Sequence, residues 1–114
     1  MVETWQVDFS LVVSEGAVEK ITEAEVIEAT KNYSERRNIT VADDTDDKAI
    51  TFTDLGTVEE IIIISDQFIE IKKDADTATA IRCKFLYLSG TNFTSLYISN
   101  TSGENANVKI ILGG

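Results

Sequence analysis

The sequence predicts a mainly β protein, an antiparallel β-sandwich of the jelly-roll or immunoglobulin-like kind. Apolar and polar residues alternate from about Thr51 to the C-terminus, most clearly in residues 81–85 and 108–110. Side chains of a strand point to opposite faces with period two, so such a run buries one face. Turn-forming residues punctuate the alternation, and the 114 residues suit one domain spanning the whole chain.

Residues 6–13 are expected to form the first strand. Apolar side chains stand at every second position from Val7 to Val13, so they would share one face. Val12 interrupts this alternation and places an apolar side chain on the opposite face. A turn signal at residues 14–16 ends the strand.

Residues 22–37 stay open between a short helix and a strand. Thr22 and Glu25 fit a capping box, the pairing that begins many helices. The spacing from Val26 to Tyr33 also suits one face of a helix. The alternative is a strand, because the remainder of the chain is rich in strands and tertiary pairing with them could make this segment extended.

The remainder of the chain is predicted to be short strands joined by hairpin-like loops, giving six to eight strands in total. Four consecutive isoleucines at residues 61–64 break the alternation, which implies burial on both faces. The further expected strands are residues 38–41, 49–53, 60–65, 68–73, 78–88, 93–99 and 106–112. The expected turns are residues 43–47, 54–56, 66–67, 74–77, 89–90 and 100–103.

The charge balance is strongly acidic, with a net charge of −10. Residues 1–57 carry thirteen acidic and five basic side chains, whereas residues 58–114 carry seven and five. Such a chain is repelled by nucleic acid and by anionic membranes, so neither is expected as a partner. No apolar stretch approaches the ~20 residues of a membrane span, and the N-terminus does not read as a signal peptide.

Chemistry-bearing residues are scarce, and no enzyme, cofactor or metal site is expected. The chain has no histidine, which excludes serine–histidine triads and histidine-ligated zinc. Cys83 is the single cysteine and is expected to pack as a small apolar side chain. The acidic run at residues 43–47 lacks the glycine of a calcium loop and is interpreted as a solvated loop. Nothing singles out a pair of carboxylates for glycoside hydrolysis.

Several strands carry apolar residues on a second face, which requires a cover. Two covers remain open at this stage: the helix or a loop of the same chain, or a neighbouring subunit. The residues assigned to a subunit interface on this reasoning are Val12, Ile61, Ile63, Leu86, Leu88 and Ile111.

The C-terminal two-thirds of the chain resembles a known class of protein. The order of strands and turns over residues 42–114 is similar to that of small β-sandwich structural proteins of tailed bacteriophages, used as head decoration or minor tail components. The segments that carry the resemblance are DDKAITFTDLG (46–56), EIIIIS (60–65), DQFIEI (66–71), FLYLSG (85–90), SLYISN (95–100) and NVKIILGG (107–114).

The resemblance implies a non-enzymatic virion protein that is made in the host cytoplasm and decorates or cements the capsid. It implies a homo-oligomer, with a trimer as the sharper expectation, in contact with other virion proteins such as the major capsid protein. Residues 1–41 match less well and are interpreted as an N-terminal adaptor region. The alternative is a carbohydrate- or receptor-binding module of a tail or fibre. Its candidate stacking residues are Trp5, Tyr33, Phe93 and Tyr97.

Overall fold

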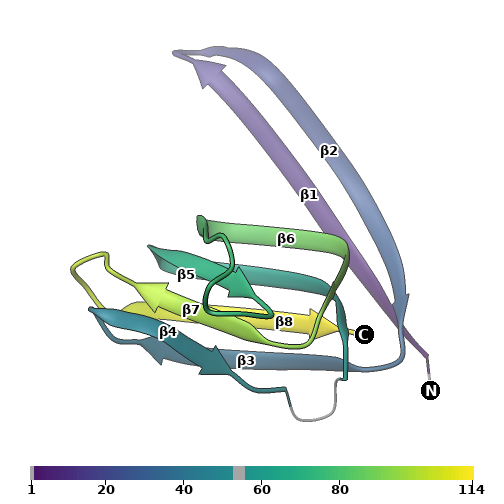
Figure 1. Cartoon of the computed structure of the whole chain (residues 1–114). Coiled ribbons are helices and arrows are strands. Elements are labelled where there is room, and N and C mark those ends of the chain that lie inside the picture. The colour runs from purple at the N-terminus through teal and green to yellow at the C-terminus, as the bar shows by residue number, and fades with distance from the viewer. Residues whose placement is uncertain (1, 53–55) are drawn as a thin grey trace. The chain divides into compact units, whose positions relative to one another are not determined.

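The computed structural model describes residues 2–52 and 56–114, and these residues form eight β-strands and no helix (Figure 1). All strand pairs are antiparallel, which confirms the mainly β, sandwich-like class. The chain divides into two compact units, Met1–Asn32 and Tyr33–Gly114. The division falls within the stretch of residues 1–41 interpreted as an adaptor region, and it places residues 34–41 in the second unit.

The first unit is a long hairpin of β1 (Glu3–Glu15) and β2 (Val18–Lys31). Its two-residue loop begins at Gly16, whose φ of 63° lies in the left-handed region that hairpin loops of this length require.

Of the two alternatives left open for residues 22–37, the strand is confirmed and the short helix is wrong, because all but residues 32–33 of this stretch lie in β2 and β3. Val26 and Ala29 would share a helix face, yet the hairpin register places them on opposite faces. Residues 22–31 pair with β1 and residues 34–37 pair with β8, and this pairing outweighs the local helical signal, as tertiary context commonly does for weak propensities.

The second unit is a six-stranded sheet organised around its longest strand, β5. The first half of β5 pairs with β8 and its second half with β7, while β6 runs along the other edge of both halves. The sheet therefore curls around a single core, with β3 and β4 at its ends. Its strands are β3 (Ser34–Val41), β4 (Thr45–Ile50), β5 (Val58–Lys73), β6 (Ile81–Phe93), β7 (Leu96–Asn100) and β8 (Ala106–Gly113).

The turn predicted at residues 66–67 is instead an irregularity inside β5. The register with β6 shifts between Ile64 and Ile69, so several residues of β5 face one of β6. Ser65 stabilises the bulge, because its hydroxyl donates to the carbonyl oxygen of Gln67 at 2.7 Å and accepts from its amide at 3.2 Å. The strand can thus bend from one half of the curled sheet to the other without ending.

The core of the second unit lies on the concave side of this sheet. Alternate residues of β5 and β8 point into it, and Phe93 packs edge-to-face with Phe52 at 6.1 Å between ring centres. The buried apolar residues are Val41, Ile50, Val58, Ile61, Ile63, Ile69, Ile71, Cys83, Phe93, Leu96, Ile98, Ala106, Val108, Ile110 and Leu112.

The acidic run at residues 43–47 is part turn and part strand, rather than wholly a loop. Asp44 and Asp47 have positive φ values of 62° and 47°, which aspartate tolerates better than most residues. Asp47 also pairs with Lys72 at 3.0 Å, and this hydrogen bond is the main reason that the pKa of Lys72 is raised. The turn predicted at residues 54–56 lies, except for Gly56, outside the described residues.

Candidate interaction surfaces

The hairpin of β1 and β2 has one apolar face. Residues that pair directly across an antiparallel hairpin point to the same side, and Val13 pairs with Ile21. Much of this face is open to solvent: Phe9 is 43 % and Ile21 is 48 % exposed. We call it the hairpin's apolar face. It comprises Trp5, Val7, Phe9, Leu11, Val13, Ile21, Ile27 and Ala29.

Two glutamates lie within the hairpin's apolar face. Glu23 pairs with Leu11 and Glu25 with Phe9, so each carboxylate stands beside an exposed apolar side chain. Residues 1–32 carry seven acidic and two basic side chains in all. A two-stranded hairpin is marginally stable in water by itself. An exposed, negatively charged apolar face of this kind is typical of a surface that becomes covered by a partner.

The second unit carries a further apolar surface on the convex side of β8, β5 and β6. Ile64 pairs with Phe85 on one side and with Lys109 on the other, so the three side chains form a row across the strands. Ile64 is 43 % and Phe85 is 55 % exposed. We call this surface the outer sheet face. Its apolar residues are Ile62, Ile64, Phe85, Tyr87 and Ile111.

Cations stand around the outer sheet face. Arg36 of β3 pairs with Ile111, and Lys109 of β8 pairs with Ile64. Both basic side chains are exposed. Lys109 pairs with Asn38, which lies two residues from Arg36 on β3. The two charges therefore lie on the same side of the sheet, next to its apolar residues.

A second basic group lies at the bulge of β5. The guanidinium carbon of Arg82 lies 4.0 Å from the centre of the Phe68 ring, and the Lys84 ammonium lies 5.0 Å from it. Both distances suit cation–π attraction. Lys84 directly precedes Phe85, so this group adjoins the outer sheet face.

Two carboxylates of this region are engaged in hydrogen bonds within the unit. Glu60 is 3 % exposed and accepts from the Tyr87 hydroxyl at 3.0 Å. Asp66 accepts from the main-chain and side-chain nitrogens of Asn107 at 2.8 and 3.1 Å. These hydrogen bonds leave both carboxylates charged, but Glu60 is buried. The exposed Asp66 is outnumbered by the exposed Arg36, Lys84 and Lys109, so the exposed charge beside Ile64 and Phe85 is mainly positive.

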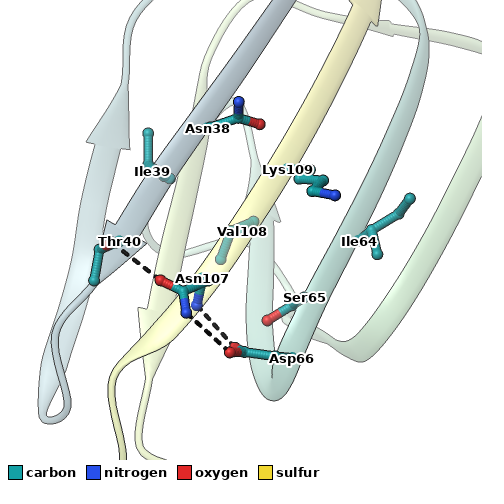
Figure 2. A pocket seen from close by; sticks show the side chains of 9 residues that line it. All are labelled: Asn38, Ile39, Thr40, Ile64, Ser65, Asp66, Asn107, Val108 and Lys109. Atoms are coloured by element: carbon teal, nitrogen blue, oxygen red, sulfur yellow. Dashed lines mark hydrogen bonds between the residues drawn. The ribbon is translucent and has the colours of Figure 1, made fainter.

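An open pocket of about 400 Å³ lies at one end of the outer sheet face (Figure 2). Figure 2 shows hydrogen bonds between its lining residues, from Thr40 to Asn107 and from Asn107 to Asp66. None of the residues described as lining it is aromatic, so it offers no ring for stacking against a sugar. The lining residues are Asn38, Ile39, Thr40, Ile64, Ser65, Asp66, Asn107, Val108 and Lys109.

The residues predicted for a subunit interface divide among three environments. Ile61 and Ile63 are 1 % and 0 % exposed and lie in the core, so their assignment to an accessible face is wrong. Leu86 and Leu88 pair with them and pack against the same core. The face was misassigned because all four positions from 61 to 64 are isoleucine, and the pattern gives no sign of which pair points inward.

The other two predicted interface residues do reach the surface. Ile111 is half-buried on the outer sheet face. Val12 is 51 % exposed, but it lies on the hairpin face opposite the apolar one. The sequence reasoning missed the surface residues that alternate along β5 and β6 with those packed in the core. They are Ile62, Ile64, Phe85 and Tyr87.

The remaining sequence candidates have structural roles in the part of the chain that is described. Cys83 is buried, and burial raises the pKa of its thiol. Asp43 accepts from the amide of Gly103 at 2.9 Å. Asp74 accepts from the amide of Thr94 at 2.8 Å, and this bond is the main cause that lowers its pKa. Residues 2–52 and 56–114 contain no cluster of three metal-ligating side chains and no helix long and apolar enough to span a membrane.

Of the four aromatic residues considered for sugar stacking, Phe93 is only 2 % exposed and packs in the core. Tyr33 is 60 % exposed, while Trp5 and Tyr97 are half-buried. Tyr33 directly precedes β3, and its main chain exchanges two hydrogen bonds with Gly114 at 3.2 and 3.1 Å.

Comparison of the chain with protein-family models, with curated proteins and with solved structures found no match.

Proposed function

We propose that this chain is a non-enzymatic structural protein of a bacteriophage virion, which decorates or cements the capsid as a homo-oligomer. The observation that carries the proposal is the hairpin's apolar face. A soluble monomer gains little from a long hairpin that exposes Phe9, Leu11 and Ile21 at about two-fifths to one-half of their area. A protein that acts through contacts with neighbouring subunits has a use for such a surface.

Two further features support an assembly role. The second unit combines a closed apolar core with an exposed outer sheet face, which gives the chain two distinct surfaces for contact. The likeness of residues 42–114 to phage β-sandwich proteins supplies the virion context, and the net charge of −10 suits a solvent-facing position on a large particle.

The carbohydrate-binding alternative has weaker support. Phe93 is buried, and the pocket on the outer sheet face is lined by amide, carboxylate and aliphatic groups without an aromatic ring. Sugar recognition in a binding module usually places such a ring where a pyranose can lie against it.

Self-association is tested first by the solution mass of the purified chain, measured by light scattering over a dilution series. We expect an oligomer that persists on dilution, with a trimer as the sharper expectation. A single monomeric species at all concentrations would contradict the homo-oligomer.

The virion role requires a separate measurement. An antibody raised against the purified chain is used to probe tailed particles, which are banded by density from induced cultures of the organism that encodes it. We expect the chain to band with the particles at a fixed ratio to the major capsid protein. Its recovery only in the soluble fraction would overturn the virion assignment, even if the chain proved oligomeric.

A further inference from the structure

We propose that the hairpin's apolar face of one copy docks on the outer sheet face of a second copy. This inference rests on the self-association in the proposed function and does not depend on the virion role. Both surfaces are exposed: Leu11 is 42 % and Val13 is 38 % exposed on the hairpin, and Ile64 is 43 % and Phe85 is 55 % exposed on the sheet.

Charge selects this pairing over its alternatives. The hairpin's apolar face contains Glu23 and Glu25, whereas Arg36 and Lys109 stand beside the apolar residues of the outer sheet face. Two hairpin faces brought together would place glutamates against glutamates. Two outer sheet faces would place basic side chains against one another. Only the mixed contact joins opposite charges, and like charges across an interface disfavour the wrong pairing.

Figure 2 shows part of the outer sheet face. Lys109 lies between Asn38 and Ile64 on adjacent strands, so its charge is placed at the apolar row. The register of the hairpin gives the complementary arrangement, because Glu23 and Glu25 lie between Ile21 and Ile27 on the same face of β2. Apolar contact supplies the attraction, and the paired charges set which faces meet.

The contact is heterologous, since it joins two different surfaces of the same chain. Heterologous contacts generate a ring when the rotation between copies closes and a filament when it does not. A ring of three would give the trimer expected from the sequence. Each copy then uses both surfaces, one toward each neighbour.

Charge reversal tests the pairing. The hairpin variant E23K/E25K and the sheet variant R36E/K109E are each expected to raise the apparent Kd of self-association by at least about tenfold. The combined variant E23K/E25K/R36E/K109E restores opposite charges and is expected to recover most of the assembly. If each pair of substitutions raised the Kd only by destabilising the fold, the two effects would add in the combined variant instead of cancelling. The readout is light scattering over a dilution series, with circular dichroism to check that each variant is folded.

A matched control carries the same charge change on the other face of the hairpin. Asp8 and Glu28 lie on the opposite side of β1 and β2, so D8K/E28K should leave the Kd within about twofold of the unaltered chain.

The possible results separate the two proposals. Weakening by both single-surface variants with recovery in the combination supports the docking. The docking is overturned if E23K/E25K or R36E/K109E leaves the apparent Kd unchanged, or if the combined variant does not recover assembly. Self-association of the unaltered chain still stands in either case. An unaltered chain that is monomeric at every concentration of the dilution series overturns both the docking and the self-association.

Discussion

The side-chain amide of Asn100, at the end of β7, donates a hydrogen bond of 2.9 Å to the main-chain carbonyl of Val41, 59 residues earlier in the chain. The same amide donates to the carbonyl of Glu104 at 2.7 Å, and its oxygen accepts from the amide of Ser102 at 3.1 Å. Asn100 is fully buried. One side chain therefore ties the end of β3 to the turn that precedes β8.

Replacing Asn100 by alanine should be strongly destabilising. The change removes three hydrogen bonds of a fully buried side chain, which costs about 2–4 kcal/mol of unfolding free energy. The measurement is urea denaturation at neutral pH. Alanine at the exposed Asn92 is the matched control and should change stability by less than about 0.5 kcal/mol.

Aspartate at position 100 should be worse than alanine at neutral pH. A carboxylate would face the carbonyl oxygens of Val41 and Glu104, which also accept hydrogen bonds. Burial of the charge adds a desolvation cost. If N100D proved as stable as N100A at pH 7, the side chain would not be as enclosed as the structure indicates.

The face assignment of β5 is tested by two neighbouring isoleucines. Ile63 is 0 % exposed in the core, so Ile63→Ala should cost about 2–5 kcal/mol through lost burial and a cavity. Ile64 is 43 % exposed on the outer sheet face, and Ile64→Ala should cost less than about 1 kcal/mol in the dissociated chain. Thermal or urea unfolding at low protein concentration compares them, and equal losses would contradict the register of β5.

Asp74 should make the stability depend on acid pH. The hydrogen bond from the Thr94 amide lowers the pKa of Asp74 in the folded chain below its unfolded value. Its contribution is therefore present above the unfolded pKa, near 4, and is lost as the pH falls through the lower folded pKa.

The variant Asp74→Asn isolates that charge. Asparagine retains an acceptor oxygen and tolerates the positive φ of 66° at this position. We expect the original chain to exceed D74N in urea midpoint at pH 7 and the gap to narrow below about pH 4. A gap that stayed constant across this range would show that the charge of Asp74 is not responsible.

Cys83 should report on unfolding of the second unit. The thiol is buried against the core, and burial raises its pKa, so both access and thiolate content are low. We expect reaction with a thiol reagent at pH 8 to be slow in the native chain and rapid in urea. Fast labelling of the native chain would indicate that the edge strand β6 opens readily.

The sequence determined the class of structure and most positions of its strands. Alternation and turn residues predicted strands within β1, β5, β6 and β8, because the period of a strand is a local property that a few neighbouring residues encode. The net negative charge and the absence of histidine were equally plain from composition.

Only the tertiary structure decided which sides of β5 and β6 face the core. Residues 61–64 are all isoleucine, so their own pattern is the same for either orientation, and the pairing of β5 with β6 and β8 settles it. Residues 22–31 fit a helix locally and became a strand because β1 offers hydrogen bonds along their whole length. The exposed faces of the hairpin and of the sheet follow from these pairings. They depend on contacts between residues far apart in the chain, which no local pattern records.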